Sequence, residues 1–266
     1  MKIVRGWLAN HERKSRRDRA NTFTDQDALD LIKKIETIPE YVSPTLDLRF
    51  DRLLRLRDKA LIAISWVWFK RGGEVLGLKR KDVAITDREV LVTFKIEKKQ
   101  KKVKICPVCQ TKNGYRSNFC RKCKTYLRTI KVTLEGDSQI VTKRKTLQHK
   151  FTRYILDWLE EFDKLTQDKE AWLFPGLKVV FTSAYFCFNS DKRMTVQNFD
   201  RILKRLDRNM TSCLFRYGGA EKYLSLGYTP YELKEIGDWS SSRMPEVYAE
   251  RKGITPAQRR WSEDER

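Results

Sequence analysis

Two arginines that lie far apart in the chain have surroundings suited to work on a phosphate group. Arg71 stands just after the apolar segment 60–69 and is followed by two glycines, and Arg216 lies near the C-terminal end. A guanidinium group stays charged and binds phosphate through two parallel hydrogen bonds, while glycines let a backbone approach an anion closely. Because an isolated arginine more often forms a surface ion pair, the interpretation depends on the residues that accompany the two.

The residues that follow Arg216 are spaced in a recognisable way. Gly227 follows Arg216 by eleven positions, Trp239 follows Gly227 by twelve, and Tyr248 follows Trp239 by nine. This segment resembles the second half of the tyrosine recombinase active site, where His-x-x-Arg is followed at these intervals by Gly, by His or Trp, and by Tyr. One position departs from the family pattern, because Cys213 stands where the family has His.

The segment 61–83 resembles the first-arginine box of the same family. In that box an apolar helix ends in Arg-x-x-Glu-Val-x-x-Leu, and a basic residue and an aspartate follow; here these are Arg71, Glu74 and Asp82. The resemblance covers residues 24–252 apart from an insertion. It implies an α+β, mostly helical fold, that of the tyrosine recombinase catalytic domain with a small antiparallel sheet, in an archaeal style related to the Xer recombinases.

The resemblance also implies roles for the site residues. Tyr248 would attack a phosphate of double-stranded DNA and form a 3′-phosphotyrosyl bond, with no metal or ATP in the chemistry. Arg71 and Arg216 would stabilise the extra negative charge of the transition state. Trp239 would donate its indole N–H to a phosphate oxygen, or serve as a core anchor.

The spacing leaves open the choice of the general acid and the effect of the cysteine at position 213. The family's general acid is a lysine on a hairpin turn, and the turn expected here holds Lys98, Lys99, Lys101 and Lys102. We favour Lys98, with Lys99 next. Cys213 carries a thiol, which is a weak donor, so either activity tolerates the loss of a secondary phosphate contact or this protein is slowed or specialised.

Four of the six cysteines form two Cys-x-x-Cys pairs, Cys106 with Cys109 and Cys120 with Cys123. In a chain without an export signal this spacing predicts a structural zinc ion held by four thiolates rather than disulfides. The stretch resembles a small zinc ribbon, inserted in the catalytic domain, with Phe119 and Leu127 as its expected core. It would serve as a DNA clamp or as a protein contact.

Composition narrows the class of partner. The 266 residues include 56 Lys and Arg against 35 Asp and Glu, a formal net charge of +21. Such a charge favours a polyanion, with nucleic acid first and a generally basic soluble protein as the alternative. The sequence lacks a long apolar run and a signal-like N-terminus, so we expect a cytoplasmic, nucleoid-associated protein with no membrane partner. The resemblance adds self-assembly on DNA as a dimer or tetramer.

We expect a basic arm at 1–22, a catalytic domain at 23–104 and 128–252, a zinc ribbon at 105–127 and a tail at 253–266. Helices are predicted over 24–37, 52–69, 147–162, 195–206, 212–226, 230–236 and 241–250, from apolar periodicity and from capping or glycine signals. Strands are expected at 90–96, at 103–105 as the start of the return strand, at 128–134 and at 139–142.

Three functions compete on this evidence. The first is an integrase or resolvase of a mobile element, which cuts and rejoins DNA. The second is a type IB topoisomerase or telomere resolvase with the same active site. The third is a DNA-binding protein that keeps the fold without the activity. The cysteine at position 213 would favour it, as would a resemblance that does not include the N-terminal helical domain with which most integrases clamp DNA.

Overall fold

The computed structural model describes residues 23–38, 48–97, 101–135, 138–180, 185–251 and 253. The predicted basic arm at 1–22, and Lys98 and Lys99, lie outside these residues. Contacts divide the chain into two compact units. The helical unit is Met1–Phe94 with Thr142–Arg266, and the ribbon unit is Lys95–Val141.

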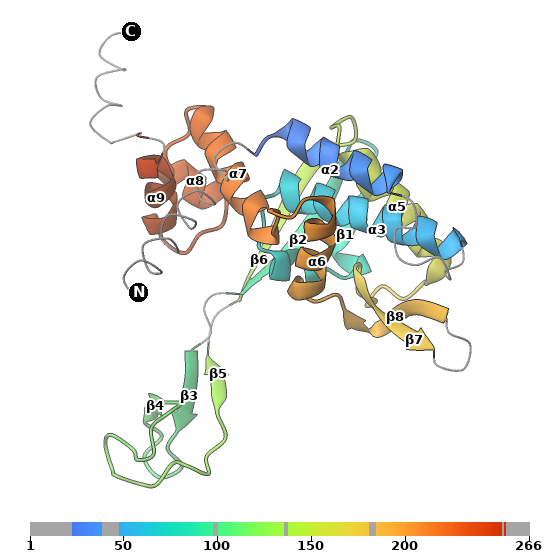
Figure 1. Cartoon of the computed structure of the whole chain (residues 1–266). Coiled ribbons are helices and arrows are strands. Elements are labelled where there is room, and N and C mark those ends of the chain that lie inside the picture. Colours follow the sequence, from blue (N-terminus) through green and yellow to red (C-terminus); the bar gives the residue numbers. More distant parts are fainter. Residues whose placement is uncertain are drawn as a thin grey trace, which may run out of the picture. The chain divides into compact units, whose positions relative to one another are not determined.

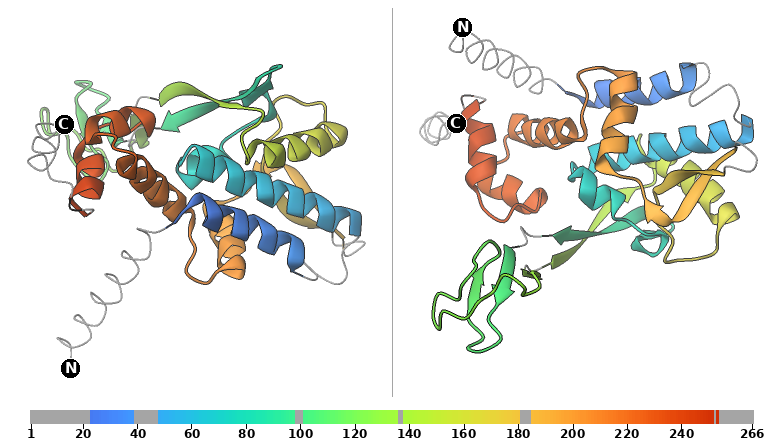
Figure 2. Two further views of the ribbon diagram at one scale, coloured as in Figure 1. Left: turned by 90° about the horizontal axis from the view of Figure 1, so that it is seen from above. Right: turned by 60° about the horizontal axis from the view of Figure 1, so that its bottom comes forward.

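The helical unit is built around one long buried helix. Its helices are α2 (Asp25–Thr37), α3 (Leu48–Val67), α4 (Gly72–Leu76), the 3-10 helix η1 (Arg80–Asp82), α5 (Thr152–Leu165), α6 (Val196–Leu206), α7 (Ser212–Ser225), α8 (Pro230–Ile236) and α9 (Arg243–Arg251). The side chains of residues 60–66 in α3 are all buried, as expected for a helix that is apolar on most sides. Helices α2 and α5 pack on opposite flanks of α3 (Figure 2).

Local sequence signals account for the starts of α2 and α6. Thr24 caps α2 in a reciprocal capping box with Asp27, and Thr195 caps α6 by accepting from the backbone N–H of Asn198. Helix α5 begins at Thr152, later than predicted, because a strand runs on to Thr146 and a turn follows it. The Thr152 hydroxyl closes this turn by donating to the Thr146 carbonyl over 2.9 Å.

A three-stranded sheet lies beside the helices (Figure 1). Its order is β1 (Val83–Ile85), β2 (Glu89–Glu97), β6 (Ser138–Thr146), with Val83 of β1 opposite Val92 of β2. Alternate β2 residues Val90, Val92 and Phe94 are fully buried, which is the period of a strand with one core face. The return strand beside β2 is therefore β6, and the prediction that this strand starts at 103–105 was wrong.

The helical unit also contains a β-hairpin and three C-terminal helices that pack together. Strand β7 (Pro175–Val180) pairs with β8 (Tyr185–Arg193) in an antiparallel hairpin. Helices α7, α8 and α9 contact one another in the orange-to-red region of Figure 1. None of the helices in the described ranges is long and apolar enough to cross a membrane.

The ribbon unit has its own sheet, in the order β4 (Lys112–Gly114), β3 (Lys101–Ile105), β5 (Thr133–Glu135). The predicted strand at 128–134 is thus reduced to its last residues. Leu127 is fully buried beside Cys106 and Cys120, as expected, but Phe119 is 59% exposed and is not part of this core. Ile130 packs against this core in addition to Leu127.

Candidate active site

The backbone of Arg71 is held by a hydrogen bond, while its guanidinium group is exposed to solvent. It is the residue before α4, and its N–H donates to Glu74 Oε2 over 3.0 Å. The guanidinium donates to Glu74 Oε1 over 2.8 Å, while the Arg71 side chain remains 52% exposed. Glu74 itself is buried, so it holds Arg71 from the protein side and leaves the outer guanidinium nitrogens for an anion.

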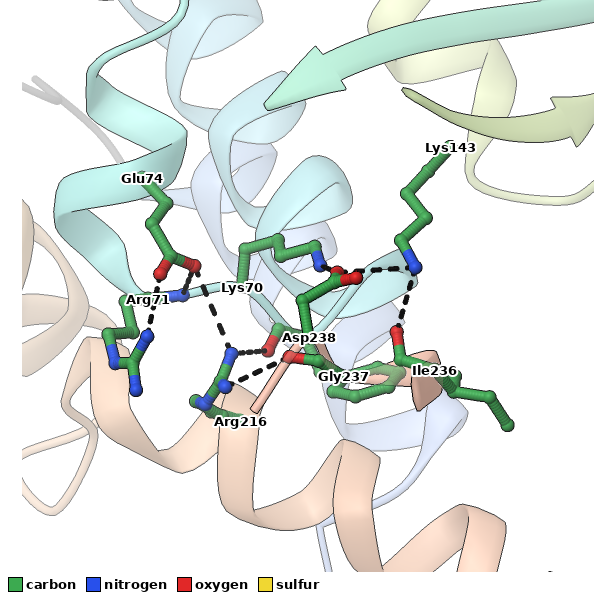
Figure 3. Close-up of polar contacts among 9 residues, drawn as sticks. Lys70, Arg71, Glu74, Lys143, Arg216, Ile236, Gly237 and Asp238 are labelled. Carbon is green, nitrogen blue, oxygen red and sulfur yellow. Dashed lines mark hydrogen bonds and ion pairs between the residues drawn. The ribbon is translucent and has the colours of Figure 1, made fainter. Parts of the chain in front are cut away.

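Arg216, in contrast to Arg71, has a buried guanidinium group that is held by hydrogen bonds. From α7 it donates to the Phe69 carbonyl over 3.2 Å and to the Gly237 carbonyl over 3.0 Å. Glu74 lies 3.9 Å away, so one carboxylate serves both arginines (Figure 3). Burial, and then the charge of Arg71, lower the pKa of Arg216 to about 10. The guanidinium therefore stays charged at neutral pH while it is positioned by three separate segments.

Two glycines permit the close packing behind Arg216. A Cβ at Gly219 would lie 2.3 Å from Cβ of Phe69, and a Cβ at Gly237 would lie 1.7 Å from a ring carbon of Trp239. Only glycine fits such contacts. The Trp239 ring consequently lies under Arg216, whose guanidinium carbon is 4.1 Å from the ring centroid. This cation–π contact fixes the indole relative to the arginine.

Tyr248, on α9, packs against the same tryptophan. The ring centroids of Trp239 and Tyr248 are 5.9 Å apart, and those of Tyr217 and Tyr248 are 5.6 Å apart. Tyr248 is only 3% exposed. Burial raises the pKa of its hydroxyl to about 12, although Arg216 and two other arginines oppose this shift. The phenol is protonated at neutral pH, so a nucleophilic role requires loss of its proton during the reaction.

Cys213 lies on α7, one turn before Arg216, and is exposed. Burial of part of the side chain raises the pKa of the thiol; the Asp200 carboxylate adds to this shift and Arg216 opposes it. The group is thus a neutral thiol at neutral pH. It can offer a phosphate a weak S–H donor and no charge.

An ionic cluster that no sequence pattern predicts lies next to the Gly237–Trp239 turn of the site. Asp238 accepts from Lys70 and forms an ion pair with Lys143 over 3.2 Å, while Lys143 also donates to the Ile236 carbonyl over 3.1 Å (Figure 3). Lys70 is fully buried, and burial lowers its pKa to about 8. The cluster ties the Gly237–Trp239 turn to the end of α3 and to β6. No local pattern signals it, since the three residues lie on separate segments.

The four predicted zinc ligands lie together in the ribbon unit. The sulfur atoms of Cys106, Cys109, Cys120 and Cys123 are all within 4.8 Å of one another. Tetrahedral zinc with Zn–S bonds of about 2.3 Å separates its sulfurs by about 3.8 Å. The spacing therefore suits a metal of this kind, and all six cysteines are free thiols.

The loops around these cysteines are those of two matching knuckles. The N–H groups of Cys106 and Cys120 donate to the carbonyls of Thr111 and Thr125 over 3.1 and 2.8 Å. The residue after each second cysteine, Gln110 or Lys124, has a positive φ. Backbone N–H groups also point at sulfur, and they lower the pKa of Cys120 to about 6, against the effect of burial. A thiol with a lowered pKa ionises readily to the thiolate, which is the form that binds a metal.

Two solved structures have a similar fold. They are complexes of the XerH site-specific recombinase, one bound to difH substrate before cleavage and one bound to palindromic difH substrate after cleavage. Their TM-scores to this chain are 0.52 and 0.50, each at 14% sequence identity, and the matches cover 85% and 86% of this chain. The chain spans about half of their length, 49% in both cases.

No family model and no curated protein sequence matches the chain. The chain has the fold of a tyrosine recombinase catalytic domain, mostly helical with small antiparallel sheets, and it carries an inserted four-cysteine unit. XerH is one protein of known structure with a similar fold.

Proposed function

We propose that this chain is a site-specific DNA recombinase, which cuts and rejoins double-stranded DNA through a covalent link to Tyr248. One observation supports this above all: Arg71, Arg216, Trp239 and Tyr248 come from distant segments and surround one small region, joined through Glu74 and through the Trp239 ring. XerH, whose fold is similar, is a recombinase bound to its substrate. The net charge of +21 suits DNA as the partner.

The proposed reaction is a single displacement at phosphorus. The Tyr248 oxygen forms a bond to the phosphorus and loses its proton to solvent, and the bond from phosphorus to the 5′ oxygen breaks. The departing 5′ oxygen takes a proton from a lysine, which we assign to Lys98. The phosphodiester is thereby exchanged for a phosphotyrosine ester, so the reverse reaction rejoins the strand without ATP.

The geometry gives the arginines different tasks in this step. Arg71, with its exposed guanidinium, binds the incoming phosphate, and Arg216 offers a preorganised charge that is already oriented by two carbonyls. Preorganised charge of this kind stabilises the transition state more than the substrate. Trp239 positions Arg216, and Cys213 adds at most a weak donor. Integration or resolution of a mobile element, with assembly of several protomers on DNA, is the biological form that we favour.

The four-cysteine unit holds one structural zinc ion in this proposal. All four tetrahedral positions are taken by protein thiolates, so no position is open for a reacting ligand. The metal would join the two knuckles and thereby stabilise a unit whose apolar core is small. We place it outside the cleavage chemistry.

A second candidate is a DNA-binding protein that does not cleave. The burial of Tyr248, which leaves it 3% exposed, and the cysteine at position 213 favour it. A relaxing topoisomerase or a telomere resolvase would share the cleavage step with a recombinase.

Covalent capture separates these candidates. The full chain is incubated with a pool of nicked, labelled duplexes of random sequence, and adducts that survive denaturation are counted. We expect an adduct at the 3′ end with the wild type and with Tyr217→Phe, the matched control at the neighbouring ring. Tyr248→Phe should give none and should bind DNA within about threefold of wild type, because only the attacking oxygen is lost.

Other outcomes of this experiment would exclude Tyr248 as the nucleophile or would distinguish between the candidate functions. An adduct with Tyr248→Phe would show that another residue is the nucleophile. Intact binding without any wild-type adduct would leave the binding protein. If an adduct forms, recombination between paired copies of the captured site identifies a recombinase, and relaxation of supercoils alone identifies a topoisomerase.

A further inference from the structure

The ribbon unit carries an unusual share of the positive charge. Residues 95–141 contain thirteen Lys and Arg against three Asp and Glu, a net charge of +10 out of +21 for the chain. Between residues 98 and 134 there are twelve cations and no acidic residue at all. Four thiolates with one Zn²⁺ would change this balance by only about −2. No carboxylate within this stretch can offset the repulsion among the cations, which favours an external polyanion.

All but one of the described basic side chains of this stretch are exposed to solvent. Lys104 is the buried one, and it donates to the Ser117 carbonyl over 3.3 Å. The others are exposed: Lys102, Lys112, Arg116, Arg121, Lys122, Lys124, Arg128 and Lys131. They come from both knuckles and from the strands and turns around them. The charge is spread along the unit, which suits a row of phosphates better than a single anion.

Aromatic side chains are exposed among these cations. Phe119 and Tyr126 are 59% and 48% exposed and contact each other edge to face, with centroids 5.6 Å apart. Lys102 and Arg116 lie over the ring of Tyr115. In an edge-to-face pair one ring covers a face of the other, which reduces the flat area on which unpaired bases stack in a single-strand binder. Rings of this kind can instead contact sugars between the phosphates of a duplex.

We propose that the ribbon unit is a second DNA-binding element, which holds the phosphate backbone of double-stranded DNA without reading its sequence. The proposal rests on the proposed function for the choice of DNA as the polyanion. The unit interrupts the chain between β2 and β6, which are paired neighbours in the sheet of the helical unit. Because the two units belong to one chain, a second contact of the ribbon with the same DNA molecule would be intramolecular, which raises affinity without new specificity.

The test removes three ribbon charges from the full-length protein. Arg121, Lys122 and Arg128 are exposed, and none is a cysteine or a described strand residue, so all three are changed to Gln. The matched control changes the exposed lysines Lys33 and Lys164 with Lys169, which removes the same charge from the helical unit. A metal content of one zinc per chain in both variants shows that the ribbon remains folded.

The readout is the salt dependence of binding to a duplex pool. Each phosphate contact contributes about 0.9 to the slope of log K against log salt, so the ribbon variant should lose about 2 to 3 from this slope, and the control less than about 1. Adduct formation at saturating DNA should stay within about twofold of wild type, because no residue of the reaction is changed.

Two results would overturn the proposal, and a third would separate it from the proposed enzyme activity. Equal slopes in the ribbon variant and the control would show that these cations do not contact DNA. A slope change that appears only with single-stranded DNA would exclude the duplex as the ligand. A wild-type protein that forms no adduct but shows the ribbon-dependent slope would refute the proposed enzyme and leave this inference standing.

Discussion

Asp238→Asn would test whether the ionic cluster behind the active site stabilises the helical unit. Asp238 is 8% exposed at its side chain and has a φ of 52°, which asparagine adopts readily. The change therefore preserves shape and backbone and removes one negative charge. Lys70, which is fully buried, loses its carboxylate, and Lys143 loses an ion pair at a side chain that is 22% exposed.

The pKa of Lys70 sets the size of the effect. Since that pKa is about 8, release of the Lys70 proton at pH 7 costs about 1 kcal/mol. The free energy of unfolding cannot fall by more than this amount through Lys70, because Lys70 would release its proton and become a neutral amine if its charged state cost more. The same upper limit is about 3 kcal/mol at pH 6 and close to zero above pH 8. The exposed part of the Lys143 pair adds less than about 1 kcal/mol.

The sign of the pH dependence follows from proton linkage. The folded-state pKa of Lys70 lies below the ordinary value of 10.5, so the unfolded chain binds the extra proton between about pH 8 and 10.5. Wild-type stability from this group therefore rises with pH over that window. Loss of Asp238 lowers the pKa of Lys70 in the folded protein further. The pH range over which Lys70 makes stability rise then starts at lower pH. The deficit of the variant should accordingly shrink as pH rises from 6 to 8.

Thermal unfolding at pH 6, 7, 8 and 9 measures this deficit. A chain of this size changes its Tm by about 2–4 °C per kcal/mol, so we expect a loss of about 3–6 °C at pH 7 and up to about twice that at pH 6. The exposed substitution Asp157→Asn is the control and should change little. Adding Lys70→Met to Asp238→Asn should abolish the pH dependence. A deficit that is independent of pH in the single variant would refute the argument.

The remaining predictions concern the candidate site and the metal. Gly237→Ala places a Cβ 1.7 Å from the Trp239 ring, so the indole must leave Arg216, and single-turnover cleavage should fall by about 10² with little loss of DNA binding. Unchanged cleavage would show that this contact does not matter. Cys213→His supplies a stronger donor beside Arg216, and the adduct yield should rise or stay level; a collapse in a folded protein would mean that the thiol has its own role. Mass spectrometry should find one zinc per chain, and Cys120→Ser should make the ribbon unit sensitive to protease while the Tm of the helical unit changes little. Absence of zinc from the wild type would refute the metal site.

Sequence alone was sufficient where the determining interactions are local. The capping box at Thr24, the cap at Thr195 and the ends of α8 follow from hydrogen bonds within a few residues. The two cysteine knuckles are also local, since each closes over five residues. Trp239 and Tyr248 were chosen because their spacing resembles that of the recombinase family, and their roles stay predictions.

Only the tertiary structure decided the pairings between distant segments. Residues 103–105 and residues within 138–146 both have sequences typical of strands, and neither pattern tells which one pairs with β2; in the structure it is β6. The cluster of Lys70, Lys143 and Asp238 brings together residues up to 168 positions apart, and Leu127 but not Phe119 is buried in the ribbon core. Strand partners and buried ion pairs depend on how far-apart segments pack, and this information is absent from the local spacing of residues.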